Sequence, residues 1–410
     1  MTIHPPRLVV LTREIAAYHD ARFAALGRRL GQLEVLAVAD EGSFAGFLAE
    51  RASPGYRAER LYPDLASYRA AAESGTLQLR ITETLDRIAP DAVAIAGWAS
   101  PESYAALQWA KARGRRVIVM SDSQAHDASR QRWREALKSR VLRYCDAALV
   151  AGRTHRAYLE DLGFAGTRVV TGYDVIDNAH FAEGARAARA DAPRLRAELR
   201  LPARYIMATG RFVAKKNFVR LVEAFGRARA ESGQEVGLLI VGDGDERSAI
   251  IAAIHGLGLT DHVYLPGFQG YDAMPALYGL AEGFAHVALT EQWGLVVNEA
   301  AAAGLPLVLS STIGAAPELL VPGQNGWLCT PGDTGSITAA LTELMRLAPE
   351  TRMAMGARSR AIVADWGPER FADGMIAAAA IAGTVPLRRP GLADRMLFRR
   401  IGQRPVETVA

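Results

Sequence analysis

The stretch that decides the fold is residues 284–300, FAHVALTEQWGLVVNEA, in which a short apolar run leads through a polar loop into a second apolar run. The first run, residues 284–289, is mostly apolar, as expected of a strand that is buried on both faces of its sheet. Gly294 lets the chain turn tightly without a Cβ atom, and the apolar spacing after it predicts a helix from about Leu295. A strand, a turn and a helix in this order are typical of a parallel α/β sheet.

The same alternation extends outward from this stretch in both directions. Short apolar runs separated by segments of helical periodicity predict strands at residues 8–11, 35–38, 93–96, 117–120, 147–150, 169–171, 205–209, 236–241, 263–265 and 307–309. The repeated strand–helix order predicts an α/β fold with two Rossmann-like, doubly wound domains that face each other across a cleft.

The domain boundaries follow from shifts in composition. We expect an N-terminal domain over residues 1–182, a linker over 183–202, a C-terminal domain over 203–365, and a C-terminal helix with a basic tail over 366–410. The linker is expected because this segment is rich in Ala, Arg and Asp and holds two prolines, and a short helix within it is left open.

Composition excludes several classes of protein. The 48 Lys and Arg residues nearly balance the 44 Asp and Glu residues, which leaves a net charge of +4 and argues against a nucleic-acid binder. The two cysteines cannot form a disulfide framework. The N-terminal residues do not resemble a signal peptide, and no apolar run reaches the ~18 residues that a membrane-spanning helix needs. We therefore expect a cytoplasmic protein, either soluble or peripheral to a membrane.

Two carboxylates frame the predicted turn between the strand and the helix in residues 284–300. Glu291 follows the strand and Glu299 lies about one turn into the helix, so each could accept hydrogen bonds from a pair of vicinal hydroxyls. The backbone N–H groups at Gly294, Leu295 and Val296 open the helix, and an uncapped helix start suits a diphosphate. A polar helix start with a capping glutamate is the alternative.

A second strand-to-helix turn carries positive charge. Gly210, Arg211 and Lys216 follow the predicted strand at 205–209 and precede the next helix. A guanidinium and an ammonium group placed there would neutralise a diphosphate and help it to leave during a reaction. A solvated basic turn is the alternative.

Together these patterns resemble the family 4, or group 1, retaining glycosyltransferases of the GT-B fold. The resemblance covers nearly the whole chain and is strongest between residues 205 and 333. The family's pair of glutamates separated by seven residues appears as Glu291 and Glu299, and its Gly-Arg turn followed by Lys appears as Gly210, Arg211 and Lys216. Its Gly-Asp-Gly turn, its Gly-Leu-Pro block and its Asn-Gly-Trp block appear at residues 242–244, 304–306 and 325–327.

The resemblance implies a donor site in the C-terminal domain and an acceptor side in the N-terminal domain. It also implies a last helix that crosses back to the first domain, where Trp366, Phe371 and Met375 would anchor it. Arg211 and Lys216 would hold the diphosphate of a nucleotide-sugar, Glu299 its ribose, and Glu291 the hydroxyls of its sugar. Catalysis would rest on Glu291, Arg211 and Lys216, with retention at the anomeric carbon and without an enzymatic nucleophile. No cofactor and no metal is expected, since Asp243 of the Asp-Gly-Asp triplet lies in the family's Gly-Asp-Gly turn rather than in a metal motif. UDP is favoured as the nucleotide because it is common in the family.

The N-terminal domain departs from the family pattern. The predicted first strand is followed by Arg13 and no glycine before Gly27, so backbone contact with the donor phosphate is in doubt there and Arg13 is a candidate to replace it. Many relatives carry a histidine after the strand at 117–120. The candidates for donor or acceptor contact in this chain are Ser121, Asp122, Ser123 and His126, with a simple cap-and-turn cluster as the alternative.

The sequence leaves open the identity of the acceptor and whether the chain contacts a membrane. Residues 111–143 hold ten Lys and Arg residues against three acids, and the tail adds Arg388, Arg389, Arg395, Arg399, Arg400 and Arg404. Positive charge beside apolar residues fits either peripheral contact with an anionic membrane at its inner face or a solvated helix face. The unidentified acceptor could be a glycan or a lipid-linked intermediate. A nucleotide-sugar epimerase and a non-catalytic nucleotide-sugar binding protein are the alternative functions.

Overall fold

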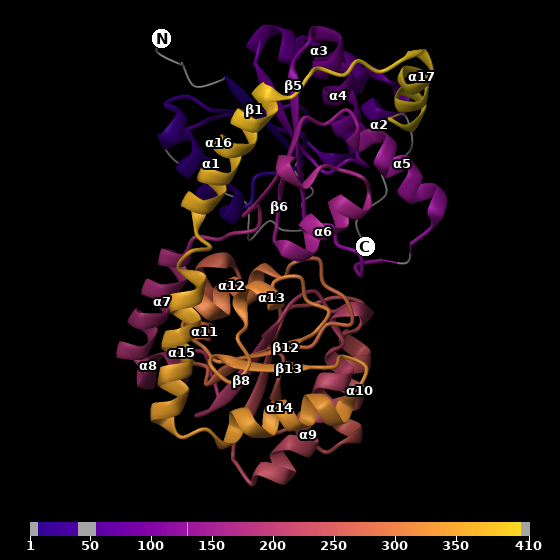
Figure 1. Cartoon of the computed structure of the whole chain (residues 1–410). Coiled ribbons are helices and arrows are strands. Elements are labelled where there is room, and N and C mark those ends of the chain that lie inside the picture. The colour runs from indigo at the N-terminus through magenta and orange to yellow at the C-terminus, as the bar shows by residue number, and fades with distance from the viewer. Residues whose placement is uncertain (1–6, 40–54, 129, 403–410) are drawn as a thin grey trace. The chain divides into compact units, whose positions relative to one another are not determined.

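The computed structural model describes residues 7–39, 55–128 and 130–402. The chain divides into two compact units, each built around one parallel sheet with helices on its faces (Figure 1). Unit 1 comprises Met1–Ala125, Ser129–Val175 and Pro368–Ala410, and unit 2 comprises His126–Ala128 and Ile176–Gly367. The two parallel sheets with interleaved helices confirm the predicted α/β class.

Unit 1 holds, within the described residues, a seven-stranded sheet in the order β3-β2-β1-β4-β5-β6-β7. Its strands are β1 (Leu8–Thr12), β2 (Glu34–Ala37), β3 (Arg57–Arg60), β4 (Ala92–Ala96), β5 (Arg116–Ser121), β6 (Ala147–Val150) and β7 (Val169–Thr171). Its helices are α1 (Ala17–Leu30), α2 (Leu65–Ser74), α3 (Thr76–Ile88), α4 (Pro101–Arg113), α5 (Arg132–Leu142), α6 (Arg153–Asp161), α16 (Pro368–Thr384) and α17 (Leu392–Ile401). All the strand pairs are parallel, so helices must carry the chain back between them.

The C-terminal part of the chain completes the core of unit 1, as the sequence predicts for the last helix. Helix α16 packs against α1 and against strands β5, β6 and β7 (Figure 1). Phe371 and Met375 of α16 are fully buried there. Trp366 differs from the prediction, because it lies in unit 2 and packs against Trp293 with ring centroids 4.9 Å apart.

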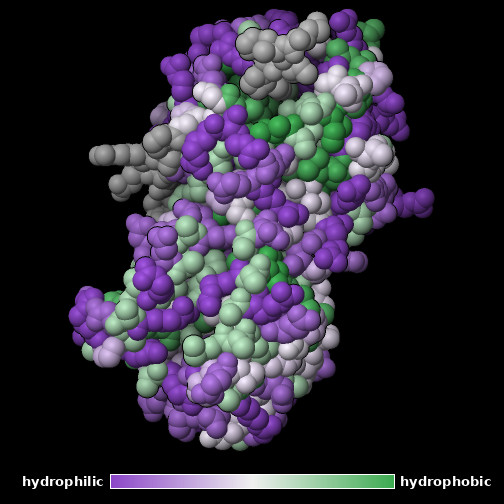
Figure 2. Space-filling model, turned by 60° about the vertical axis from the view of Figure 1, so that its left-hand side comes forward, coloured by the Kyte–Doolittle hydropathy of each residue, from purple (hydrophilic) through white to green (hydrophobic). Residues whose placement is uncertain are grey.

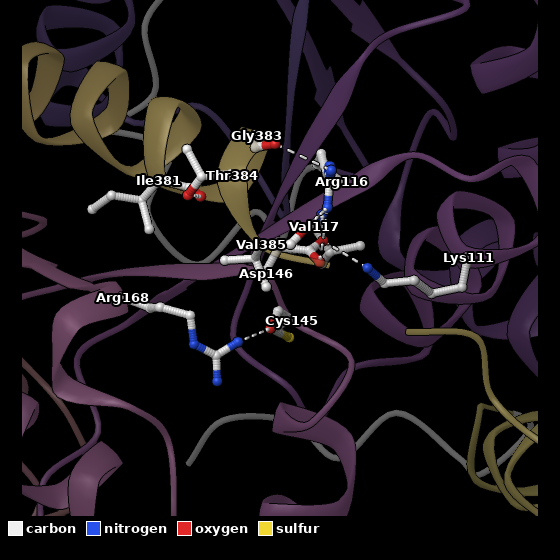
Figure 3. A network of polar contacts seen from close by, with 10 residues as sticks. All are labelled: Lys111, Arg116, Val117, Cys145, Asp146, Arg168, Ile381, Gly383, Thr384 and Val385. Carbon is white, nitrogen blue, oxygen red and sulfur yellow. Dashed lines mark hydrogen bonds and ion pairs between the residues drawn. The ribbon is translucent and has the colours of Figure 1, made fainter. Parts of the chain in front are cut away.

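A buried polar network ties the chain after α16 to the sheet of unit 1 (Figure 3). The Lys111 ammonium donates to Asp146 Oδ2 over 2.6 Å, and the Val117 N–H donates to the same oxygen over 2.7 Å. Arg116 lies beside this pair and donates to the carbonyl oxygens of Gly383 and Val385. A buried ion pair is tolerated when additional hydrogen bonds satisfy its members, as they do here.

Unit 2 holds, within the described residues, a six-stranded parallel sheet in the order β10-β9-β8-β11-β12-β13. Its strands are β8 (Tyr205–Thr209), β9 (Gly237–Val241), β10 (Val263–Tyr264), β11 (Gly283–His286), β12 (Leu307–Ser310) and β13 (Gly326–Cys329). Its helices are α7 (Asn178–Ala190), α8 (Ala192–Glu198), α9 (Phe218–Ser232), α10 (Arg247–Gly256), α11 (Met274–Leu280), α12 (Leu295–Ala302), α13 (Ala316–Leu319), α14 (Thr334–Arg346) and α15 (Pro349–Val363).

Residues 183–202, which the sequence suggests as a linker, are largely helical. They contain most of α7 and all of α8, and α7 packs tightly on α11 within unit 2. Gly184 shows how close this packing is, since a Cβ atom there would lie 2.5 Å from the side chain of Pro275.

Strand β11 is shorter than its apolar run. The sequence predicts a strand over 284–289, whereas the strand ends at His286. The chain then leaves the ladder, because the Leu289 N–H donates to Lys215 O over 2.8 Å instead of to a neighbouring strand, and the Leu289 side chain is 42% exposed. The last three residues of the run therefore form the start of a loop.

Figure 2 shows that hydrophilic side chains cover most of one face of the molecule, with an area of hydrophobic surface in unit 1. Within the described part of the chain, none of the helices combines the length and the apolar character that crossing a membrane requires.

Candidate functional site

The candidate site lies where the strand order of unit 2 reverses. Strands β8 and β11 are neighbours in the sheet, and the next strands along the chain lie on opposite sides of this pair. The loops that follow β8 and β11 therefore leave the same edge of the sheet in different directions. In open α/β sheets, ligands bind at such a switch point, outside the carboxyl ends of the strands.

The loop after β8 is fixed by close backbone packing on the Gly-Asp-Gly turn. A Cβ atom on Gly242 would lie 2.0 Å from Gly210 O, and Gly242 has a φ of +138°. The Phe212 N–H donates to Asp243 O over 2.8 Å, which locks the two loops together. A Cβ atom on Gly244 would lie 2.7 Å from Phe212 O. Both glycines are therefore required for this contact, which holds Arg211 and the following turn in place.

The same loop is tied to the loop after β11 by one asparagine. Asn217 follows the short 3₁₀ helix Ala214–Lys216 and has a left-handed backbone conformation, with a φ of +64°. Asparagine tolerates this conformation better than most residues. Its side-chain amide is buried and donates to Val287 O and Pro331 O, each over 2.9 Å. Lys216 is thereby held next to the end of β11.

Lys216 and Glu291, which are 75 residues apart in the chain, meet as an ion pair at this edge of the sheet. Each of the two side chains is only 14% exposed. The buried imidazole of His286, the last residue of β11, lies 3.0 Å from the same carboxylate through Nε2. The structure thus brings together two of the three predicted catalytic residues and adds a third side chain that the sequence analysis did not single out.

The surroundings keep Glu291 ionised. Burial alone would raise the pKa of its carboxyl group, but the hydrogen bond from His286 and the positive charge of Lys216 outweigh burial and hold this pKa far below its usual range. The pKa of His286 is also lowered, first because the ring is fully buried and then because Lys216 repels a second positive charge. At neutral pH the site therefore holds a carboxylate, a neutral imidazole and an ammonium group.

Glu299, the second predicted carboxylate, has a different environment. It lies in α12 with 8% of its surface exposed, and the Tyr278 hydroxyl donates to Glu299 Oε2 over 2.8 Å. Burial raises the pKa of Glu299 to about 7, even though the hydrogen bond from Tyr278 works in the opposite direction. One carboxyl group of the pair thus stays ionised while the other titrates near neutral pH.

The start of α12 provides the backbone donors that the sequence predicts. Helix α12 begins at Leu295, and no side chain caps it, since its N-cap residue is Gly294 with a φ of +94°. A Cβ atom on Gly294 would lie 3.2 Å from Glu291 Cγ, so the glycine makes room for the carboxylate. Leu295 and Val296 are partly exposed at this helix start. Uncapped N–H groups here, aided by the helix dipole, favour an anion.

The loop between Glu291 and α12 is held rigidly. The Gly314 N–H donates to Glu291 O over 3.2 Å, and the Ala315 N–H donates to Trp293 O over 3.0 Å. Trp293 is buried, and its indole N–H donates to Asn298 Oδ1 over 2.8 Å. The backbone that carries Glu291 is therefore positioned by packing on unit 2 itself.

The remaining predicted residues lie in or next to unit 1. Arg13 follows β1 and donates to Glu102 Oε1 over 3.1 Å, while its guanidinium lies 4.9 Å from the centre of the Tyr68 ring. Ser121 is the buried last residue of β5, and its hydroxyl accepts a hydrogen bond from the Ser123 N–H over 3.1 Å. These contacts agree with a turn cluster at the end of β5.

Asp122 and His126 lie in the loop after β5. Asp122 is partly buried, and its charge acts on the buried hydroxyl groups of Tyr18 and Tyr173. His126 is exposed and belongs to the short segment grouped with unit 2, where the Thr290 hydroxyl donates to His126 O over 3.1 Å. The backbone of His126, rather than its ring, makes this contact with the residue that precedes Glu291.

A match to a known protein family lies within unit 2. Residues 192–362 match the family profile described as "Glycosyl transferases group 1". The chain is 31% identical over 140 residues to an N-acetyl-alpha-D-glucosaminyl L-malate synthase of Bacillus anthracis, which covers 34% of this chain and 35% of that protein. It is 30% identical over 187 residues to a GDP-mannose-dependent alpha-(1-6)-phosphatidylinositol monomannoside mannosyltransferase of Mycobacterium tuberculosis, which covers 42% of this chain and 48% of that protein. The chain thus spans less than half the length of these curated relatives.

Solved structures extend the fold similarity to nearly the whole chain. The structure of Anabaena HepE in complex with UDP and glucose aligns with a TM-score of 0.72 at 15% identity and covers 92% of this chain and 99% of that one. Sucrose-phosphate synthase from Thermosynechococcus elongatus aligns with a TM-score of 0.72 at 19% identity and covers 92% of this chain and all of that one (100%). Both are GT-B glycosyltransferases, so the predicted fold class and the resemblance to the group 1 family are confirmed.

Proposed function

We propose that the chain transfers a sugar from a nucleoside diphosphate sugar to an acceptor, with retention at the anomeric carbon. The premise is that residues 192–362 belong to the group 1 glycosyltransferases. The observation that carries the proposal is the meeting of Lys216 and Glu291 at the switch point of unit 2, beside the uncapped start of α12. A cation, a carboxylate and free helix N–H groups at one sheet edge suit a ligand that joins a diphosphate to a polyhydroxylated sugar.

The roles of the residues follow from their chemistry. Lys216 and Arg211 hold the diphosphate, together with the backbone N–H groups at Gly294, Leu295 and Val296. A diphosphate would attract the Lys216 ammonium away from Glu291, and the released carboxylate could then accept hydrogen bonds from the sugar hydroxyls. Lys216, Arg211 and these three backbone groups are the proposed contacts with the diphosphate, and Gly210, with a φ of +150°, lets the loop before them turn.

Glu299 binds the ribose in this proposal. Glu299 belongs to the first turns of α12, and its ionised carboxylate can accept hydrogen bonds from two hydroxyl groups. The hydrogen bond from Tyr278 orients the carboxyl group within the buried site.

Catalysis in this proposal depends on the stabilisation of the leaving diphosphate. Negative charge builds on the diphosphate as the bond to the sugar breaks, and preorganised cationic and N–H donors lower the energy of that charged state. The chain's own cations would supply this stabilisation, so the reaction is proposed to be independent of metal ions. UDP is the favoured nucleotide, and the HepE structure, a complex with UDP and glucose, supports testing it first. The GDP-mannose dependence of the mycobacterial relative makes GDP the second nucleotide to test.

The test is a binding and turnover panel of UDP-, GDP-, ADP- and dTDP-sugars with the purified chain, with and without EDTA. We expect one donor to be hydrolysed slowly in either condition, with its sugar released in the configuration that it had in the donor. Isomerised donor would instead indicate an epimerase, and binding without turnover would indicate a nucleotide-sugar binding protein. The absence of both binding and turnover for all four donors would contradict the proposal.

We also propose that the chain contacts an anionic membrane through helices α5 and α17. The two helices are joined because Asp394 of α17 accepts hydrogen bonds from Arg140 and from the Tyr144 hydroxyl. Their most exposed apolar side chains are Trp133 (57%), Leu392 (78%) and Met396 (69%). Exposed arginines accompany them at Arg132, Arg134, Arg399 and Arg400. Basic residues beside exposed apolar ones are typical of surfaces that bind anionic lipid.

Other members of the basic segment already have partners within unit 1, so the proposed surface is smaller than the charge count suggests. Arg113 pairs with Asp86 over 2.7 Å, and Lys138 pairs with Glu135 over 2.9 Å. Arg404 lies outside the described residues.

The membrane proposal is tested by co-sedimentation with vesicles of phosphatidylcholine alone or mixed with phosphatidylglycerol. We expect salt-sensitive binding to the mixed vesicles, reduced at least about tenfold in the triple variant Trp133→Ser, Leu392→Ser, Met396→Ser. Met353→Ser is the matched control, because Met353 is 73% exposed on α15 of unit 2. Equal binding by both variants would contradict the assignment of the surface.

A further inference from the structure

We infer that His286 is a positioning residue of the donor site, whose Nε2–H holds the Glu291 carboxylate in the orientation that the sugar requires. The inference rests on the function proposed above and goes beyond it. An apolar side chain would be the ordinary occupant of a buried position in a parallel strand, since a polar group there must give up its contact with water. The position of this histidine therefore calls for a reason.

The geometry gives that reason. His286 is the last residue of β11, its side chain is fully buried, and its ring stacks on Phe284 with centroids 6.2 Å apart. Its Nε2 atom lies 3.0 Å from Glu291 Oε2. The strand fixes the backbone of the histidine and the surrounding core fixes its ring, so this hydrogen bond comes from a rigid support.

The chemistry of the partners fixes which atom carries the proton. An ionised carboxylate only accepts hydrogen bonds, so the proton must lie on Nε2 of His286. The other ring nitrogen, Nδ1, is buried and has no hydrogen-bond partner among the described residues. A second proton on Nδ1 would therefore create a buried donor without an acceptor, which is costly. The ring is consequently neutral, with Nε2–H as its single donor.

His286 and Lys216 both approach Glu291 Oε2, but they are not equivalent. Lys216 has a long side chain with four rotatable bonds, and the proposed function has it turn to the diphosphate when the donor binds. The imidazole does not bind the diphosphate in the proposed function, and its short side chain keeps it beside the strand. His286 is thus the group that keeps Glu291 in place in the donor complex. Lys216 and His286 are also the titratable groups whose charges and hydrogen bonds lower the pKa of this carboxylate.

The first experiment compares His286→Leu with His286→Gln in the full chain. Leucine fills the buried volume without a donor, whereas the glutamine amide nitrogen reaches about as far as Nε2 and can donate. For the donor that the wild-type chain uses, we expect His286→Leu to lower kcat by about 10- to 100-fold, because a misplaced reacting group has an effect of that size. The Kd of the free nucleoside diphosphate should change by less than about twofold, and His286→Gln should recover most of kcat.

A merely structural role predicts another pattern. Leucine would then lower the unfolding midpoint or weaken nucleotide binding and kcat together, and glutamine would give no selective recovery. Either that pattern or an unchanged kcat in a folded His286→Leu chain would overturn the inference.

The second experiment does not depend on turnover. Histidine ¹⁵N NMR of the wild-type chain, with the His286 signal assigned by its loss in His286→Leu, should show a protonated Nε2 and an unprotonated Nδ1 between about pH 7 and pH 8. A proton on Nδ1, or a doubly protonated ring in this range, would overturn the inference even if the chain is an active transferase. If the NMR result is as expected and the wild-type chain turns over no donor, the hydrogen bond stands while the proposed function and the positioning role both fail.

Discussion

At the scale of single residues, Glu291 has two kinds of neighbour, an ammonium group on a long side chain and an imidazole at the end of a strand. The carboxylate is held ionised by His286 and Lys216 against the effect of burial. In the proposed donor complex it contacts the sugar, whereas Lys216 contacts the diphosphate that every nucleotide ligand carries. The two residues should therefore differ in what their loss does.

We predict that Glu291→Gln lowers kcat at least about 100-fold and changes donor Kd much less, because the amide no longer holds the sugar in its reacting position while the diphosphate contacts remain. Lys216→Ala should weaken donor binding and kcat together, each by about tenfold or more, because a charge-assisted bond to the diphosphate is lost. Titration calorimetry and initial rates with the same donor measure both. Full activity of Glu291→Gln would show that the donor-site assignment is wrong.

Glu299 gives a prediction that concerns stability. Its pKa in the folded chain is raised to about 7 from an ordinary value of 4.5, so the folded state holds a proton that the unfolded state releases at lower pH. The contribution of this group to the free energy of unfolding is fully present below pH 4.5 and is lost as the pH rises to about 7. Multiplying the shift by about 1.4 kcal/mol per pH unit gives a loss of about 3 kcal/mol.

Glu299→Gln should remove this dependence, since an amide keeps an acceptor for Tyr278 and does not titrate. Urea denaturation of both proteins gives the free energy of unfolding of the variant minus that of the wild type. We expect this difference to increase by about 3 kcal/mol between about pH 4.5 and pH 8, because only the wild type loses stability. Parallel pH profiles for the two proteins would be incompatible with the raised pKa.

At this scale the positions of polar residues after strands could be predicted, whereas the contacts between them could not. Glu291 and Lys216 could be placed near strand ends because each follows an apolar run. Their contact joins residues 75 positions apart and depends on β8 and β11 being neighbours. His286 was missed because a histidine within an apolar run looks like part of the core. Its position five residues before a glutamate at the carboxyl end of a strand was the available signal.

At the scale of elements, the site depends on glycines that let two loops touch. Gly242 combines a φ of +138° with a Cβ position 2.0 Å from Gly210 O. Gly256, at the end of α10, has no atom within 4 Å of its Cβ position and serves as a control. The loop that carries Arg211 and Lys216 should therefore be disturbed by substitution at Gly242 and not by substitution at Gly256.

We predict that Gly242→Ala lowers the free energy of unfolding by about 2 to 4 kcal/mol, because the backbone must move to relieve the clash. Gly256→Ala should be neutral or stabilising by up to about 1 kcal/mol, since alanine favours a helix. Chemical denaturation of the two variants measures the difference. A neutral Gly242→Ala would mean that the two loops do not pack as described.

Most strands could be predicted because a sheet buried on both faces leaves apolar runs. Strand β3 was missed since its four residues, Arg57–Arg60, are mainly exposed and three of them are charged. The predicted strand at 284–289 extends past the end of β11, because apolar composition does not show where a chain stops pairing with its neighbouring strands. The extent of helices α7 and α8 was underestimated, because a composition rich in Ala, Arg and Asp is common to linkers and to surface helices.

At the scale of the whole molecule, the chain forms two compact units, and the last part of the sequence belongs to the first of them. Phe371 of α16 and Phe398 of α17 are both fully buried in unit 1. Arg116 also holds the segment that joins these two helices (Figure 3). The fold of unit 1 is therefore completed only by residues that follow unit 2 in the sequence.

We predict that a chain ending at Gly367 loses cooperative unfolding of unit 1 and its amide protection in β5, β6 and β7, because α16 no longer covers these strands. A chain ending at Pro390 keeps α16 and should retain that protection at lower stability. Hydrogen-exchange mass spectrometry of both truncated chains decides this, with unit 2 as the internal reference. Native-like protection in the shorter chain would show that α16 is dispensable for unit 1.

The central claim is that a nucleoside diphosphate binds at the carboxyl ends of β8 and β11. The most direct measurement is hydrogen exchange of the full chain with saturating UDP or GDP, whichever binds. We expect slower exchange in residues 210–217 and 289–299, with a smaller effect in the Lys216→Ala chain. Protection confined to other segments, with these two unchanged, would contradict it.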